Sequence, residues 1–340
     1  MEGCRAISTQ VNAIDPVFGT GATAVAVIAS YYVAKFQSNK FTSMGISGID
    51  IHKRDKPVRA EMGGLAILFG LAVGSTVYFV ANLTLDGAGV LFASGFSTIA
   101  FTGLVGVADD IIEIRQRYKP FLIVAASTPL MYYLLDRGSI FIPEFGTVHL
   151  GLLYPLVAVP LAITTSANFS NLLAGFNGME AGCAAISIGT MAFLSQITGH
   201  PTIAILGYIL SFAYVGFLGL NWYPAKIFPG DTGTLMSGAA VAAMGLAAGL
   251  EFEAIVLSIP AAIDFTLKIV SRTPFKQRRL YGNTSVNEDG TLNPPGYPAL
   301  VHAFMRVSPI RERGLVISVL AMQAVYAIIA IAVVIVIVLR

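Results

Sequence analysis

Residues 90–119 read VLFASGFSTIAFTGLVGVADDIIEIRQRYK. An apolar run of the length that crosses a bilayer, about 20 residues, ends at two adjacent acids, Asp109 and Asp110. A basic segment follows and ends at Lys119. This change from an apolar run to a charged gap recurs along the chain. The pattern predicts an integral membrane protein whose polar residues gather in the gaps between spans.

The composition excludes an ordinary soluble protein. Of the 340 residues, 55% are hydrophobic and 12% are charged, and the mean hydropathy is +0.74. A soluble domain carries roughly 25% charged residues. The two cysteines, Cys4 and Cys183, lie in unrelated contexts and predict no disulfide framework.

Apolar segments separated by charged gaps predict an all-α fold with about ten membrane-spanning helices in a single domain, residues 1–340. The expected spans are 17–37, 63–81, 90–108, 120–136, 150–167, 179–197, 201–220, 232–250, 253–271 and 314–338. The gaps that alternate with them on one side lie near 38–62, 109–119, 168–178, 221–231 and 272–313.

The basic residues lie almost entirely on one side of this arrangement. Of the 21 Lys and Arg residues, all but Arg5, Arg137 and Arg340 fall in or beside the five gaps near 38–62, 109–119, 168–178, 221–231 and 272–313. Cytoplasmic loops carry an excess of Lys and Arg. We therefore expect these gaps to be cytoplasmic and both termini to lie on the other side of the membrane.

The acid pair Asp109 and Asp110 is the first candidate for chemistry. Adjacent carboxylates repel each other, and a divalent cation would relieve that repulsion. Mg²⁺ prefers carboxylate oxygens together with substrate phosphates, and Lys119 could meet a phosphate as a point charge. A solvated helix end is the alternative interpretation.

The other cytoplasmic gaps contain further candidates, each with a structural alternative. Asn171, Gly175 and Asn177 lie in an Asn- and Gly-rich gap that suits a metal or a planar base but also an ordinary turn. Asp231 follows Pro-Gly at a helix start, where it could bind a metal or cap the helix. Phe228 could stack on a base, and Glu61 could accept hydrogen bonds from a nucleoside or simply complement a helix dipole.

The long gap 272–313 is strongly basic and contains Arg278 and Arg279. It could form an anion site or a surface for anionic lipids. Asp264 and Lys268, four residues apart in an expected span, are interpreted as a structural ion pair. The four histidines show no spacing typical of a zinc site.

Taken together, these motifs resemble the polyprenyl-phosphate N-acetylhexosamine-1-phosphate transferase family, and in particular its dolichyl-phosphate GlcNAc-1-phosphotransferase branch in archaea and eukaryotes. The resemblance rests on NLLAGFNGME at residues 171–180, on Asp109 and Asp110 with Lys119, on FPGD at residues 228–231, and on SPIRER at residues 308–313. It covers the chain from about Gly48 to the last helix.

The resemblance implies a role for each motif residue. Asn171 and Asp231 would hold Mg²⁺, or Mn²⁺ in its place, beside Asp109 and Asp110. Lys119 would contact the diphosphate. Gly175, Asn177 and Phe228 would hold uracil, with Glu61 assisting. The basic loop has KQRR at residues 276–279 in place of the family's histidine-containing patterns, so Arg278 and Arg279 are both candidates for the sugar phosphate.

The expected reaction is transfer of GlcNAc-1-phosphate from UDP-GlcNAc to dolichyl or another polyprenyl phosphate, with release of UMP. It would take place at the cytoplasmic face of the cell membrane in an archaeon, or of the endoplasmic reticulum in a eukaryote. Membrane lipids and a second copy of the chain are expected partners, and nucleic acid is not. Three alternatives stay open: another UDP-sugar or undecaprenyl phosphate, a secondary transporter of an anionic solute, and a structural scaffold.

Overall fold

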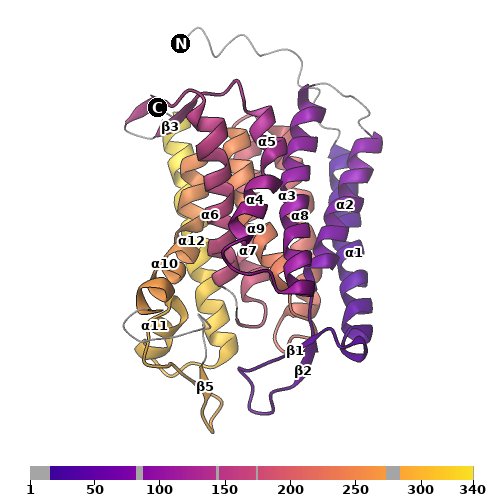
Figure 1. Cartoon of the computed structure of the whole chain (residues 1–340), viewed down its shortest axis with the longest axis vertical. Helices are drawn as coiled ribbons and strands as arrows, with labels where there is room; N and C mark the ends of the chain where they lie inside the picture. The colour runs from indigo at the N-terminus through magenta and orange to yellow at the C-terminus, as the bar shows by residue number, and fades with distance from the viewer. Residues whose placement is uncertain (1–15, 82–86, 143–144, 174, 273–283, 340) are drawn as a thin grey trace.

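The structure is a computed structural model that describes residues 16–81, 87–142, 145–173, 175–272 and 284–339. It is an elongated bundle of roughly parallel and antiparallel helices, with short hairpins at both ends (Figure 1). The helices are α1 (Pro16–Lys40), α2 (Gly64–Ala81), α3 (Gly87–Ile112), α4 (Lys119–Ala126), α5 (Thr128–Tyr133), α6 (Val159–Leu172), α7 (Met179–Ile197), α8 (Pro201–Asn221), α9 (Gly230–Ala248), α10 (Glu251–Arg272), α11 (Leu300–Val307) and α12 (Glu312–Leu339). A 3₁₀ turn, η1 (Thr42–Met44), follows α1, and a π-helical turn, η2 (Tyr154–Ala158), leads into α6.

Each of the ten expected spans contains helix in the structure, although the span 150–167 becomes helical only at Leu153. Four of the described helices, α3, α7, α8 and α12, are long and apolar enough to cross a membrane, and α2 is a shorter apolar helix. The prediction for residues 179–197 matches α7 at both ends. The mainly helical, membrane-protein character of the chain is confirmed.

Three predicted boundaries were wrong. The expected span 120–136 is divided into α4 and α5 near Ser127, because Pro129 lacks an N–H and its ring crowds the preceding turn. The gap at 109–119 begins later than predicted, since α3 continues through the acid pair to Ile112. The gap at 168–178 also begins later, since α6 continues to Leu172 and therefore carries Asn171.

The fold is not purely helical, because three antiparallel hairpins lie in the connections between helices. They pair β1 (Ser47–Ile49) with β2 (Val58–Ala60), β3 (Ser139–Ile142) with β4 (Gly146–His149), and β5 (Ser285–Val286) with β6 (Leu292–Asn293). The first and third hairpins and α11 lie at one end of the bundle, and the second lies at the opposite end (Figure 1). Within the gap predicted at 272–313, the described residues from 284 onward contain this third hairpin and α11.

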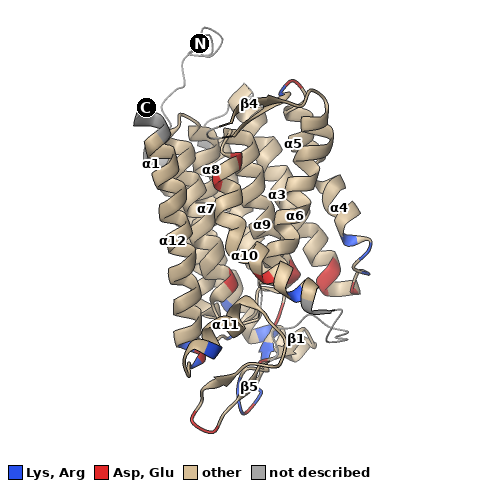
Figure 2. Ribbon diagram, turned by 90° about the vertical axis from the view of Figure 1, so that its left-hand side faces the viewer, with Lys and Arg blue, Asp and Glu red and all other residues tan. Residues whose placement is uncertain are grey.

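Charged residues are unevenly distributed along the bundle. Most of them lie at the end that carries α11, β1 and β5, whereas the middle of the bundle contains few (Figure 2). We call this end the charged end. At this end the predicted pair forms in α10, with Lys268 Nζ 2.7 Å from Asp264 Oδ2, and Asp264 also accepts a hydrogen bond from the backbone N–H of Leu300 in α11.

Helix α9 forms the centre of the bundle. Every residue from Thr232 to Ala248 except Ala247 is buried, and α9 packs against both α3 and α6. Glycines permit these close approaches. A Cβ at Gly106 of α3 would lie 2.4 Å from the Cα of Thr232, and one at Gly238 would lie 2.1 Å from the carbonyl oxygen of Ser166. Because α3 and α9 meet at Gly106, the acids that follow it are held beside the first turn of α9.

We predict that Gly106→Ala destabilises the protein, because its new methyl group would overlap backbone that cannot move aside. Overpacking of this kind costs about 1–3 kcal/mol. Gly21→Ala in α1 is the matched control, since nothing lies within 4 Å of a Cβ there. Thermal unfolding in detergent should show a lower midpoint for Gly106→Ala and an unchanged or higher one for Gly21→Ala. Equal midpoints would contradict the close helix crossing.

Candidate functional site

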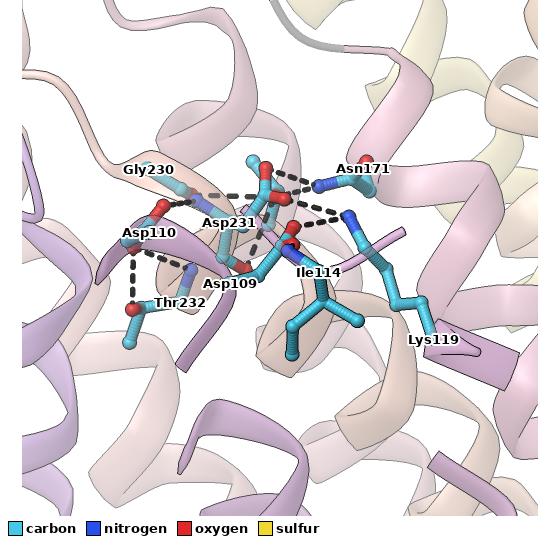
Figure 3. Close-up of polar contacts among 9 residues, drawn as sticks. Asp109, Asp110, Ile114, Lys119, Asn171, Gly230, Asp231 and Thr232 are labelled. Atoms are coloured by element: carbon cyan, nitrogen blue, oxygen red, sulfur yellow. Dashed lines mark hydrogen bonds and ion pairs between the residues drawn. The ribbon is translucent and has the colours of Figure 1, made fainter. Parts of the chain in front are cut away.

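The two acids at the end of α3 occupy an electrostatically unfavourable position, because the negative end of a helix dipole repels carboxylates. Asp110 is stabilised by the first turn of α9. Its Oδ1 accepts the backbone N–H of Asp231 at 2.7 Å, and its Oδ2 accepts the N–H and hydroxyl of Thr232 at 3.2 and 2.7 Å (Figure 3). A carboxylate at the N-terminus of a helix satisfies free N–H groups and complements the dipole. Asp110 therefore joins the end of α3 to the start of α9.

Gly230 makes this joint possible. Its φ of +67° is a left-handed conformation, and a Cβ there would lie 2.7 Å from Asp110 Oδ2. Both facts favour glycine, which adopts positive φ without steric cost. The glycine before Asp231 is thus favoured by the local backbone, apart from any chemistry of Asp231.

Asp109 points to the other side of the same helix end and is almost fully buried. Its Oδ1 accepts the backbone N–H of Ile114 at 2.7 Å, and its carboxylate pairs with the ammonium of Lys119. Lys119, at the start of α4, has a side chain that is only 1% exposed, and its Nζ also lies 2.7 Å from Asp231 Oδ2. Lys119 thus bridges two carboxylates that lie 122 positions apart in the sequence.

Asp231 is the member of this group that opens to the outside, with a side chain that is 33% exposed. Its Oδ1 accepts a hydrogen bond of 2.8 Å from Asn171 Nδ2 at the end of α6. The same amide nitrogen lies 2.9 Å from the hydroxyl oxygen of Thr234. The structure therefore gathers Asp109, Asp110, Lys119, Asn171 and Asp231 in one cluster, as the sequence predicted. Figure 3 shows their side chains converging from α3, α4, α6 and α9.

The four residues expected to hold the nucleoside also lie together. Glu61, Gly175, Asn177 and Phe228 line a cavity of about 250 Å³ at the charged end, and Asp231 lines it as well. The cavity is therefore continuous with the acid and amide cluster. Burial, followed by the negative charges of Asp110 and Asp231, raises the pKa of Glu61. Gly48 leaves space for Glu61, whose carboxylate would collide with a Cβ at that position.

Asn177 differs from the simple expectation that its side chain serves only a ligand. Its Nδ2 donates to Asp50 Oδ2 at 3.0 Å, and the residue is only 3% exposed. Sequence reasoning missed Asp50, as it missed Thr232 and Thr234. The two threonines follow Asp231 within one helical turn, and their hydroxyls could have been suspected from that spacing. Asp50 offered no such signal. Arg278 and Arg279 lie outside the described residues.

The oxygen and nitrogen atoms of the cluster can be compared with the ligands that a divalent cation prefers. No cluster of three or more His, Cys, Asp or Glu residues arranged to hold a metal occurs in the described ranges. The cluster instead offers the carboxylate of Asp231 and the amide of Asn171, with Asp109 nearby. Asp109 and Asp231 share the ammonium of Lys119, and Asp110 accepts hydrogen bonds from α9 instead, so the three carboxylates keep an excess of negative charge. Such a set fits Mg²⁺, which keeps several waters and binds one or two carboxylates together with substrate phosphates.

Comparison with known proteins gives a consistent result. Residues 92–249 match the family model described as Glycosyl transferase family 4. A protein of Saccharolobus solfataricus is 33% identical over 287 residues, which cover 84% of this chain and 87% of the relative. Its provisional name is UDP-N-acetylglucosamine–dolichyl-phosphate N-acetylglucosaminephosphotransferase. A Sulfolobus acidocaldarius protein with the same provisional name is 31% identical over 291 residues, with the same coverage of both chains.

A more distant group of relatives carries a different name. A phospho-N-acetylmuramoyl-pentapeptide-transferase of Clostridium botulinum is 33% identical over 227 residues, which cover 63% of this chain and 68% of the relative. The archaeal relatives match over a larger share of the chain. With the cluster and cavity in place, these matches show that the chain belongs to glycosyl transferase family 4, the polyprenyl-phosphate N-acetylhexosamine-1-phosphate transferases that its motifs resemble.

Proposed function

We propose that this protein transfers GlcNAc-1-phosphate from UDP-GlcNAc to dolichyl phosphate or a related polyprenyl phosphate. The observation that carries this proposal is the position of Asp231, which faces the cavity and contacts both Lys119 and Asn171. A nucleoside bound in the cavity would extend its phosphates toward this cluster. The names of the archaeal relatives support the choice of sugar and lipid.

The reaction requires one phosphate to approach another. An oxygen of the lipid phosphate would form a bond to the phosphorus that carries GlcNAc, while the bond from that phosphorus to the UMP oxygen breaks. UMP leaves with the electron pair of the broken bond. A lipid phosphate monoester has a second pKa near 6 and is mostly dianionic at neutral pH, so positioning and charge neutralisation would supply most of the catalysis.

The residues of the cluster would divide this work. Asn171 and Asp231 would hold Mg²⁺, which when bound supplies Lewis-acid neutralisation of the diphosphate. Lys119 would contact a phosphate oxygen from its position between Asp109 and Asp231. Asp109 would steer the lipid phosphate or accept its residual proton. Asp110 would keep the start of α9 in place and order the water around the ion.

We further propose ten membrane crossings, with the charged end in the cytoplasm and both termini outside. The start of α1 and the end of α12 lie at the end opposite to the charged end (Figure 1). The basic residues of the charged end agree with the tendency for positive charge to remain in the cytoplasm. This orientation places the cavity where a soluble nucleotide sugar can enter, at the cell membrane of an archaeon or the endoplasmic reticulum of a eukaryote. Membrane lipids and a second copy of the chain are proposed partners.

The activity predicts Mg²⁺-dependent release of UMP from UDP-GlcNAc by the purified protein when dolichyl phosphate is present. EDTA should abolish the release and added Mg²⁺ should restore it. Asp231→Asn should lower kcat by about 100-fold or more, because it removes a charged ligand at the phosphates.

UDP-MurNAc-pentapeptide and undecaprenyl phosphate, tested in the same assay, address the alternative suggested by the Clostridium relative. UMP release with no lipid dependence would contradict the proposal, and movement of an anion across vesicles without UMP would favour a transporter.

Separate roles for the two acids predict different responses to pH. Asp109→Asn should change the shape of the pH–rate profile. It removes a carboxylate that is placed to accept the residual proton of the lipid phosphate or to steer that phosphate by its charge. Asp110→Asn should lower the rate at every pH and lower the thermal midpoint, because an amide nitrogen cannot accept the N–H groups of α9. Equal losses with unchanged profiles would show that Asp109 is not a base.

The orientation can be tested by labelling with a membrane-impermeant maleimide. In a Cys4→Ser background, Asp55→Cys between β1 and β2 should react only from the cytoplasmic side. Thr147→Cys in β4 should react only from the outside. Both native residues are exposed, and Cys183 is buried and should stay unlabelled. Labelling of both positions from one side would rule out the proposed topology.

A further inference from the structure

Four polar residues form a closed ring of contacts beside the cavity, with one link made by a backbone N–H. Lys53 Nζ lies 3.3 Å from Asp50 Oδ2 and pairs with the carboxylate of Glu312. Glu312 Oε1 accepts the backbone N–H of Asn177 at 3.0 Å, and Asn177 Nδ2 donates to Asp50 Oδ2 at 3.0 Å. We call Asp50, Lys53, Asn177 and Glu312 the four-residue ring. It joins three segments at the charged end: the β1–β2 hairpin, the α6–α7 loop and the first turn of α12.

The ring is buried, which separates it from an ordinary solvated charge cluster. Asp50 and Glu312 are 4% and 5% exposed, and the side chain of Lys53 is 13% exposed. Lys53 also lies over the ring of Tyr223, 4.3 Å from its centroid. Buried charges are costly unless they are paired. Because two carboxylates depend on one ammonium, the position of each ring member is tightly coupled to the others.

The ring supports two parts of the cavity lining, the β1–β2 hairpin and the α6–α7 loop. Asp50 and Asn177 line the cavity, whereas Lys53 and Glu312 do not. On the same walls His52 stacks on Phe176, with ring centroids 4.1 Å apart. Glu312 fixes the backbone of the α6–α7 loop at Asn177. Asp50 fixes the direction of the Asn177 amide, so that its oxygen is the end turned away from Asp50. Lys53 holds both carboxylates in place.

We propose that Lys53 and Glu312 are positioning residues for the nucleoside half of the site, acting through Asp50 and Asn177. This inference rests on the proposed function, because it assumes that the cavity receives the nucleotide donor. The cluster at Asp231 is held by different contacts, from Asp110, Lys119 and Asn171. Loss of the ring should therefore weaken donor binding and leave the phosphate chemistry intact.

The test compares variants of the ring in the UMP-release assay. Lys53→Met and Glu312→Ala should each raise KM for UDP-GlcNAc about tenfold, the effect of losing hydrogen bonds to a buried group. Their kcat should stay within about twofold of wild type, and KM for dolichyl phosphate should not change. Lys53→Arg keeps the charge and should restore KM to within about threefold. Glu312→Gln keeps an acceptor for Asn177 and should lie between Glu312→Ala and wild type.

Arg137→Met is the matched control for the loss of a partly buried ion pair. Arg137 lies 2.9 Å from Glu251 Oε1 near the opposite end of the bundle. This variant should lower the thermal midpoint without changing KM. If the ring variants also lower only the midpoint, or if they lower kcat at constant KM, the inference is wrong.

Direct binding of UDP, measured by calorimetry on the same proteins, separates the two levels of the proposal. Wild-type protein that binds UDP and releases UMP, with ring variants of equal affinity, would overturn only the role of the ring. Wild-type protein that neither binds UDP nor releases UMP would overturn both. If Glu312→Ala fails to fold, Lys53→Met and Glu312→Gln still decide the question.

Discussion

The hydrogen bonds from the first turn of α9 to the carboxylate of Asp110 are the contact on which the site depends. They place a carboxylate from the C-terminal end of α3, where the helix dipole repels it, on the N-terminal end of α9, where the dipole attracts it. The same bonds give the free N–H groups of α9 an acceptor. Gly106 and Gly230 remove the side chains that would keep the two backbones apart. Once α3 and α9 are joined in this way, Asp109 and Asp231 are brought to the same place without further contacts. Lys119 and Asn171 then complete the group from α4 and α6.

The charged groups of the cluster differ in how far they are buried. Lys119 is enclosed between Asp109 and Asp231, while Asp231 remains partly open on the cavity side. The unbalanced negative charge is therefore presented where a cation and a phosphate can arrive together. The same field extends to Glu61, whose raised pKa reflects burial and the nearby carboxylates. This excess of negative charge is the reason for proposing that the diphosphate binds together with a cation, since Mg²⁺ prefers carboxylate oxygens and substrate phosphates.

Much of this arrangement could be predicted from the sequence. Apolar length located the helical segments to within their ends, and the one-sided distribution of Lys and Arg grouped distant motifs at one end. The sequence could not show that α3 and α6 extend through Asp110 and Asn171, because polar residues at a helix end look the same as residues in a loop. Pro129 offered a signal for the break between α4 and α5, but the predicted span 120–136 did not include a break there. Asp50 was missed because its role depends on Asn177 and Glu312, which are far from it in the chain. Contacts between segments of that kind leave no periodic signal.

The burial of α9 has a consequence for how this protein can adapt to its substrates. Its small residues are enclosed by neighbouring helices along almost its whole length. The helix, and with it Asp231 and Thr232 on its first turn, therefore has little freedom to shift. The walls beside them belong to short connections between helices, which tolerate change more easily. A preference for a different sugar donor can therefore arise by substitutions in these connections, while α9, which carries Asp231, stays the same.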